Sequence, residues 1–257
     1  RQRQMCIRDR IGLVQYINSL NLDNDGFSKA ESLADITNGA TGIASIFALI
    51  MLANNLSQEY SKGTIKFLYT KPVSRSAILT AKIVLGFINY IIFAVIGTVF
   101  KYVFTNIVLN KGSYDLSLLN EKLADGYFGR TVYQQLAIVN LTGLAVMIFY
   151  IAMVVLVCVV FKTQILSLVL VMISVFGGTI IQGLTVLIVD KFEWVKYHMF
   201  NVPLFQLFYA TEDNRYLVKN TFKFENVNSL LIMLIAYSAI FFIVSYVINS
   251  RRDITID

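Results

Sequence analysis

Five stretches of the chain contain no Asp, Glu, Lys or Arg and are long enough to belong to membrane-spanning helices. They are residues 36–58, 83–100, 131–161, 163–189 and 226–250. A spanning helix needs about 20 mostly apolar residues, and hydrocarbon offers no partner to unpaired backbone N–H and C=O groups. Trimmed at their polar ends, and with the second extended back past Lys82, the stretches predict helices at 37–55, 77–101, 136–161, 164–188 and 229–249.

The fold class predicted by this pattern is all-α: a polytopic helical membrane protein with five visible spans. β-branched and aromatic residues are common in the stretches, but the uninterrupted length of each stretch favours helix over strand. A β-barrel would need polar and apolar residues to alternate over segments of about ten residues, and this chain has no such alternation. Composition agrees, since 56% of the residues are hydrophobic and 15% are charged.

Basic residues between the stretches predict how the protein is oriented in the cell membrane. The linker at 57–76 is rich in lysine and arginine, Lys162 separates the third stretch from the fourth, and Arg251 follows the last. If the helices alternate in direction, these three segments lie on one side. Short basic segments favour the cytoplasm, so the C-terminus is predicted to be cytoplasmic, and the loops near 102–135 and 189–228 to lie outside.

The predicted organisation is an outer N-terminal segment, residues 1–35, followed by a transmembrane domain, residues 36–257. The first ten residues, RQRQMCIRDR, lack the apolar run of a signal peptide. They resemble translated adapter sequence from a sequencing library. We therefore hypothesise that residues 1–10 are not native, and that the native protein has six spans, the first of which has been lost upstream.

Residues suited to catalysis are scarce. The phosphate-binding pattern G-x-x-x-x-G-K-[ST] is absent from the sequence, so the chain is predicted not to be an enzyme. His198 is the only histidine, and Cys6 and Cys158 fit no ligand pattern, so neither a metal site nor a cofactor is predicted. The net charge of +6 fits contact with anionic membrane lipid rather than nucleic acid, because the basic residues lie between spans. No charged residue lies mid-span, which disfavours an ion-coupled carrier.

The linker between the first two stretches reads SQEYSKGTIKFLYTKPVSRSAILTAKI. It resembles the cytoplasmic segment between the second and third spanning helices of permease subunits in type-2 ATP-binding-cassette (ABC) transporters. In that family a Glu, a Gly-Thr pair, a Pro and an Arg occur in this order. The matching residues here are Glu59, Gly63, Thr64, Pro72 and Arg75, followed by Lys82. The order of the other helices and the long outer loop before the last one also resemble the family, whereas the family's first helix is missing.

The resemblance implies a permease that moves a substrate across the membrane with ATP hydrolysed by a separate ABC ATPase subunit. It also implies that two permease subunits pair, as a homodimer or a heterodimer. A coupling helix within residues 57–76 would dock into the ATPase. The residues that the resemblance assigns to this ATPase coupling are Glu59, Gly63, Thr64, Lys66, Pro72 and Arg75.

The residues themselves leave a second interpretation of the linker open. Residues 59–69 have helical character, and Ile65, Leu68 and Tyr69 offer an apolar face suited to the membrane surface. Pro72 disfavours helix at the residue before it, which ends this segment ahead of the next span. The alternative is an ordinary basic linker that only sets topology, in a non-transport scaffold or sensor subunit.

Polar residues inside the spans are candidates for a substrate path. Gln182 is the strongest candidate, because an amide that deep in a span needs a hydrogen-bond partner. Asn89 and Thr179 are the other residues that we assign to this path. The alternative is that such groups only form hydrogen bonds across the helix bundle.

Two further patterns concern packing. Ala40, Ala44 and Ala48 are spaced by four in the first stretch. Small residues at that spacing let helices approach closely, and we interpret them as packing within the chain rather than as a dimer seam. Trp194 and Tyr197 lie in the last outer loop. Because Trp and Tyr favour the membrane–water interface, that loop is predicted to hold an interfacial or re-entrant helix.

Overall fold

The computed structural model describes residues 29–61, 74–109, 116–123, 126–161 and 163–251. Within these ranges the chain is helical, and its only β pairing is one isolated bridge between Lys122 and Thr131. The long helices are α2 (Lys29–Ser61), α4 (Arg75–Leu109), α5 (Val132–Phe161), α6 (Gln164–Ile188) and α9 (Val227–Arg251). The short ones are η1 (Leu116–Asn120), η2 (Glu193–Tyr197), η3 (Met199–Asn201), α7 (Leu204–Ala210) and α8 (Glu212–Asn220). The all-α prediction is confirmed.

Among the described residues, four helices are long and apolar enough to cross a membrane. They are Arg75–Val103, Val132–Phe161, Gln164–Ile188 and Val227–Arg251, and they coincide with the last four predicted spans. The first predicted span lies inside α2, which carries Asn54 and Asn55 near its C-terminal end. The predicted polytopic membrane architecture is therefore confirmed, with the spanning part of α4 ending two residues later than the sequence indicated.

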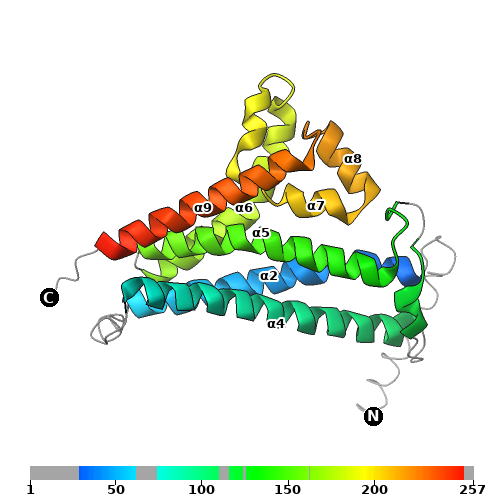
Figure 1. The fold of residues 1–257 in the computed structure, drawn as a ribbon, viewed down its shortest axis with the longest axis horizontal. Helices are drawn as coiled ribbons and strands as arrows, with labels where there is room; N and C mark the ends of the chain where they lie inside the picture. Colours follow the sequence, from blue (N-terminus) through cyan, green and yellow to red (C-terminus); the bar gives the residue numbers. More distant parts are fainter. Residues whose placement is uncertain (1–28, 62–73, 110–115, 124–125, 162, 252–257) are drawn as a thin grey trace, which may run out of the picture.

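Helix α5 forms the centre of the bundle, and α2, α4, α6, α7 and α9 all contact it (Figure 1). Residues 143–161 of α5 are apolar on every face, which is typical of a helix surrounded by other helices. Val154, Val155 and Val159 are fully buried and belong to a core shared with α2 and α4. A second core joins α5 to α7 and α9 through Phe149, Phe205 and related residues.

Helix α2 packs most extensively against α4 and α5. Ala44 and Ala48 of its small-residue stripe are buried in this packing, and the side chain of Ala40 lies outside the described residues. The interpretation of the stripe as a contact within the chain is confirmed for Ala44 and Ala48. Across this interface Gly86 of α4 faces the side chain of Leu52, so close that a Cβ atom would touch it.

Substitution of Gly143 in α5 is expected to destabilise the bundle. A Cβ atom built on Gly143 would lie 2.7 Å from the Tyr90 hydroxyl oxygen and 3.2 Å from Nε2 of Gln206. The Tyr90 ring is rigid and buried, so Gly143→Ala should cost about 1–3 kcal/mol. A lower midpoint of thermal unfolding in detergent would show it. Gly183→Ala is the control, because no atom lies within 4 Å of that position; equal midpoints for the two variants would contradict the packing.

The end of the bundle where α6 stops and α9 starts is covered by η2, η3, α7 and α8 (Figure 1). We call these four helices the outer cap, because they lie away from the end of α2 and the start of α4. The segment around Trp194, which was predicted to hold an interfacial or re-entrant helix, forms the short helices η2 and η3. Helices α7 and α8 occupy sequence that the analysis above left as loop. Helix α8 begins where the Thr211 hydroxyl accepts a hydrogen bond from the Asn214 amide at 3.2 Å, which stabilises the first turn.

Candidate functional site

The ends of four helices meet at the opposite end of the bundle. Here α2 ends at Ser61, α4 begins at Arg75, α6 begins at Gln164 and α9 ends at Arg251 (Figure 1). We call this the linker end, because the segment between α2 and α4 leaves from it. All three basic segments of the sequence analysis adjoin it. The prediction that they share one side of the protein is therefore consistent with the fold.

Glu59 and Lys82 form an ion pair across the linker end. Glu59 lies in the last turn of α2 and Lys82 in the second turn of α4, and the Lys82 ammonium donates a hydrogen bond to the Glu59 carboxylate. Their side chains are only 23% and 20% exposed. A hydrogen bond between charged groups contributes about 1.5–3 kcal/mol. The pair therefore holds α2 and α4 together at the point where the linker joins them.

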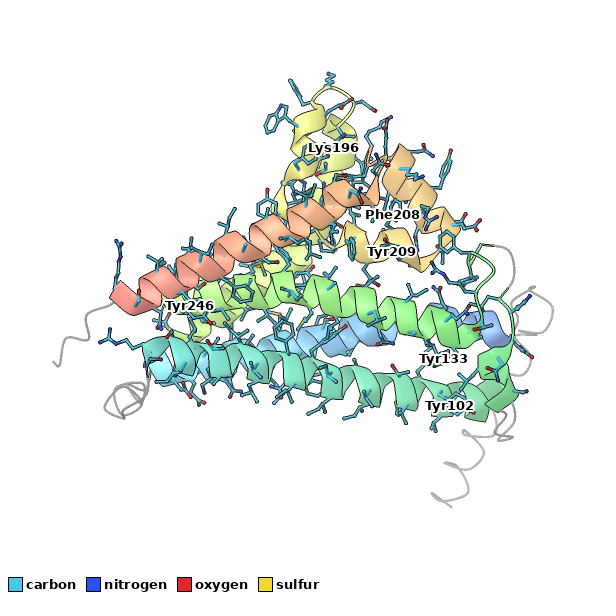
Figure 2. The ribbon with its side chains drawn as sticks, in the orientation of Figure 1. Tyr102, Tyr133, Lys196, Phe208, Tyr209 and Tyr246 are labelled. Carbon is cyan, nitrogen blue, oxygen red and sulfur yellow. The ribbon has the colours of Figure 1, made fainter. Side chains whose placement is uncertain are left out.

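Helix α9 is attached to the start of α4 at the same end. The Asn249 side-chain amide donates to the backbone carbonyl of Arg75 at 3.3 Å. The hydroxyls of Thr80 and Tyr246 are hydrogen-bonded at 2.7 Å, and Figure 2 shows Tyr246 on the side of α9 that faces α4. These two contacts tie the first turns of α4 to the last turns of α9.

The α5–α6 link is fastened to α2 by a polar contact. Nε2 of Gln164, the first residue of α6, donates to the side-chain oxygen of Asn54 at 2.5 Å. The residue before Asn54 in α2 makes a second contact: the Ala53 carbonyl oxygen lies 3.7 Å from the buried Cys158 thiol of α5. Polar contacts near the linker end thus join α2 to α4, α5 and α6, and α4 to α9.

The structure brings Glu59 and Arg75, two of the predicted coupling residues, to the linker end. Gly63, Thr64, Lys66 and Pro72 lie outside the described residues. Glu59 belongs to the last turn of α2, whereas the sequence analysis began a surface helix there. Helix α2 continues past the charge-free stretch as far as Ser61. Glu59 can lie in this helix beside the bundle because the Lys82 ammonium offsets the cost of partly burying its carboxylate.

The polar residues predicted for a substrate path are partly brought together at the other end. Thr179 and Gln182 of α6 line a cavity of about 70 Å³ that Phe200 of η3 also lines. Asn89 is not among the residues that line it. Nε2 of Gln182 donates to the Phe200 carbonyl oxygen at 2.5 Å, which is the partner that a deep amide was expected to need. The cavity has room for about two waters.

His198 lies beside this cavity, in contact with the ring of Phe200. The Thr185 hydroxyl donates to the Ile181 carbonyl oxygen at 2.8 Å, so its oxygen accepts a hydrogen bond from the Nε2–H group of His198. Nδ1 of His198 is buried without a hydrogen-bond partner in the described structure. Burial lowers the pKa of His198 below its ordinary value of 6.5, because a charged ring would lose hydration there.

Acidification is therefore expected to weaken the outer cap through His198. The unfolded chain takes up this proton first, so the stability contributed by neutral His198 is present above about pH 6.5 and is lost as pH falls toward the lower folded pKa. The thermal unfolding midpoint should drop more between about pH 7 and pH 5 in the wild type than in His198→Gln. Equal drops would show that His198 does not titrate in this way.

Lys82, Tyr246 and Asn249 are contributors to the linker end that sequence reasoning did not assign to the site. Lys82 was noted only as a residue after the motif, and the other two lie in the last span. Polar residues at the end of an otherwise apolar helix are the signal that was available for Tyr246 and Asn249. Their partners lie more than 160 residues away in sequence, which no local pattern reveals.

Comparisons with known proteins match the chain over nearly its whole length, including both ends of the bundle. The family model described as ABC-2 family transporter protein matches residues 9–254. The chain is also similar to YhcI, an uncharacterized protein of Bacillus subtilis (strain 168). The two are 26% identical over 254 residues, which cover 96% of this chain and 76% of YhcI. The matched region includes the linker end, the five long helices and the outer cap.

Proposed function

The chain belongs to the ABC-2 family of transporter proteins, and from this premise we propose that it is the permease subunit of an ABC transporter. It carries a substrate across the cell membrane, and a separate ABC ATPase subunit hydrolyses the ATP. Two permease subunits, identical or different, pair to form the transport unit. The C-terminus and the linker end face the cytoplasm, where the ATPase is found.

The single observation that carries the proposal furthest is the convergence of helix ends at the linker end. An ATPase acts on a permease by pushing or turning a docked segment, so the segment must be joined firmly to the spans. The Glu59–Lys82 ion pair joins α2 to α4 next to the linker, and the Asn249–Arg75 contact joins α4 to α9. A force that the ATPase exerts on the linker would therefore act on α2, α4 and α9 together.

The residues proposed for coupling fall into two roles. Glu59 and Arg75 position the two ends of the linker through their contacts with Lys82 and Asn249. The remaining coupling residues lie within the linker itself and are proposed to dock into the ATPase: Gly63, Thr64, Lys66 and Pro72. Glu59 is therefore a positioning residue, because its carboxylate is engaged by its own chain.

The proposed substrate path runs past Gln182 and Thr179. Their cavity of about 70 Å³ is far below the roughly 300–1,000 Å³ of small-molecule sites. Opening the path requires α6 to separate from η3, which breaks the bond between Gln182 and the Phe200 carbonyl. The small cavity and this hydrogen bond support the proposal of a path that is closed in this state and that ATP-driven motion from the linker end would open. Asn89, on α4, is proposed to join the path in the opened state.

Purification of the chain from native membranes in mild detergent tests the proposal. An ABC ATPase subunit is expected to co-purify, and the complex should show ATP hydrolysis that orthovanadate inhibits. Replacement of linker residues 63–66 by a flexible Gly-Ser segment should release the ATPase while the chain remains inserted. A stable, inserted chain with no ATPase partner would support the scaffold or sensor alternative.

A further inference from the structure

The outer cap contains a polar pocket that the proposed transport path does not use. Its volume is about 780 Å³, and it lies between η2, the end of α8 and the first turns of α9. Lys196, Lys219 and Lys223 line it together with Asn220, Asn226 and Asn228. Figure 2 shows Lys196 at the tip of the molecule far from Tyr246, which marks the linker end. The volume is in the range of small-ligand sites.

The pocket carries more positive than negative side chains. Its three lysines face two glutamates, Glu193 and Glu225. The Lys196 ammonium is nearly buried, donates to the Lys223 carbonyl oxygen at 3.0 Å and lies 3.6 Å from the Glu193 carboxylate. That carboxylate is itself 77% exposed, so water screens much of its charge.

Lys219 offers a positive charge that no carboxylate neutralises. Within the described part of the chain it takes part in no ion pair, and its ammonium lies 5.9 Å from the ring of Phe208. Lys223 has a partner in Asp190 at 3.4 Å, but both side chains are largely exposed. An anion entering the pocket would therefore meet one free ammonium, one weakly paired ammonium and three side-chain amides.

The pocket also reaches the apolar outer surface of the bundle. Ile232 of α9 forms part of its wall and is 66% exposed, and Ile235 continues this exposed face one turn further along. Trp194, directly next to the lining residue Glu193, is 73% exposed. Trp side chains favour the membrane–water interface. The pocket therefore opens at the level where lipid headgroups meet acyl chains.

We propose that this pocket binds the phosphate headgroup of an anionic phospholipid. The phosphate is held by Lys219 and Lys223 with the neighbouring asparagine amides, and an acyl chain lies along Ile232 and Ile235. A soluble phosphate compound shares the headgroup chemistry but would gain nothing from the exposed isoleucines. The combination of a cationic polar pocket with an apolar extension favours the lipid. The site would attach the outer cap to its leaflet while α6 moves.

The single tryptophan of the chain allows a direct test. Trp194 fluorescence is measured in nanodiscs that contain phosphatidylglycerol or phosphatidylcholine with brominated acyl chains, which quench tryptophan on contact. The wild-type complex is expected to show stronger quenching by the brominated phosphatidylglycerol. Lys219→Glu should reduce the preference for phosphatidylglycerol about fivefold or more, since one basic residue near a membrane surface contributes about that factor in binding.

Lys191→Glu is the matched control. Lys191 is exposed and close to Trp194 in sequence, but it does not line the pocket, so this variant should keep the preference. Lys223→Met provides a second variant that removes charge without reversing it, and should also lower the preference. Equal quenching by the two lipids, or equal loss in Lys191→Glu and Lys219→Glu, would overturn the proposal. Loss of the preference on adding inorganic phosphate alone would assign the pocket to a soluble anion instead.

Discussion

Replacing Glu59 by alanine is expected to uncouple the protein from its ATPase without preventing membrane insertion. The change removes the ion pair that joins α2 to α4 at the linker, and it leaves the Lys82 charge without its partner in a position only 20% exposed. Loss of a charged hydrogen bond of about 1.5–3 kcal/mol is equivalent to a factor of roughly 10–100 in an equilibrium. ATP hydrolysis by the purified complex and the amount of bound ATPase should fall on this scale.

The double variant Glu59→Lys with Lys82→Glu distinguishes positioning from direct contact. If Glu59 acts by holding α2 to α4, exchanging the charges restores the pair and recovers much of the coupling. If the Glu59 carboxylate itself binds the ATPase, the exchanged variant stays as inactive as Glu59→Ala. A positioning role for Glu59 requires recovery in the exchanged variant, and absence of recovery would exclude that role.

A disulfide between α6 and η3 is expected to lock the transport path closed. A Cβ atom at Gly178 would lie 3.9 Å from the Cβ of Phe200, which is within the about 3.5–4.5 Å range of disulfides. The variant Gly178→Cys with Phe200→Cys, made in a chain without Cys6 and Cys158, should therefore cross-link on mild oxidation. Transport in reconstituted vesicles should fall to background, because Gln182 can no longer separate from the Phe200 carbonyl.

Reduction of that disulfide distinguishes a reversible block of transport from damage to the protein. Activity should return with a reducing agent, and each single cysteine variant should stay active under oxidation. The pair Gly177→Cys with Phe200→Cys is a geometric control, since Phe200 is not among the atoms near Gly177 and cross-linking should be slow. A cross-linked protein that transports at the wild-type rate would exclude a path that opens between α6 and η3.

Hydropathy alone predicted the helices because the membrane imposes the same requirement on every span. Residues 164–188 match α6 at both ends, since Thr163 stands before the helix and Asp190 follows it. Helix α4 continues to Leu109, beyond the predicted end at 101, because Lys101 and Tyr102 interrupt the apolar run without interrupting backbone hydrogen bonding. Composition therefore predicts the apolar part of a helix, whereas the helix itself can continue through polar residues at its ends.

The outer cap was harder to predict for a physical reason. Helices α7 and α8 are short, and α8 is held by local capping at Thr211 and by Val218, which is buried against the second core. The Thr-Glu-Asp start was a readable signal. The pocket lysines were visible only as scattered charges, because Lys196, Lys219 and Lys223 converge through tertiary packing. The linker residues were predicted through family resemblance, while the partner of Glu59 emerged only from the structure.

The most direct test of coupling between the linker end and the proposed path is whether ATP changes the cavity lined by Gln182 and Phe200. The measurement is the rate of cross-linking between cysteines at 178 and 200 in the reconstituted complex, with and without trapping by ATP and orthovanadate. We expect trapping to slow the cross-linking several-fold, and Glu59→Ala to remove this response. An unchanged rate on trapping, in a complex that hydrolyses ATP, would contradict the claim that the linker end drives the path.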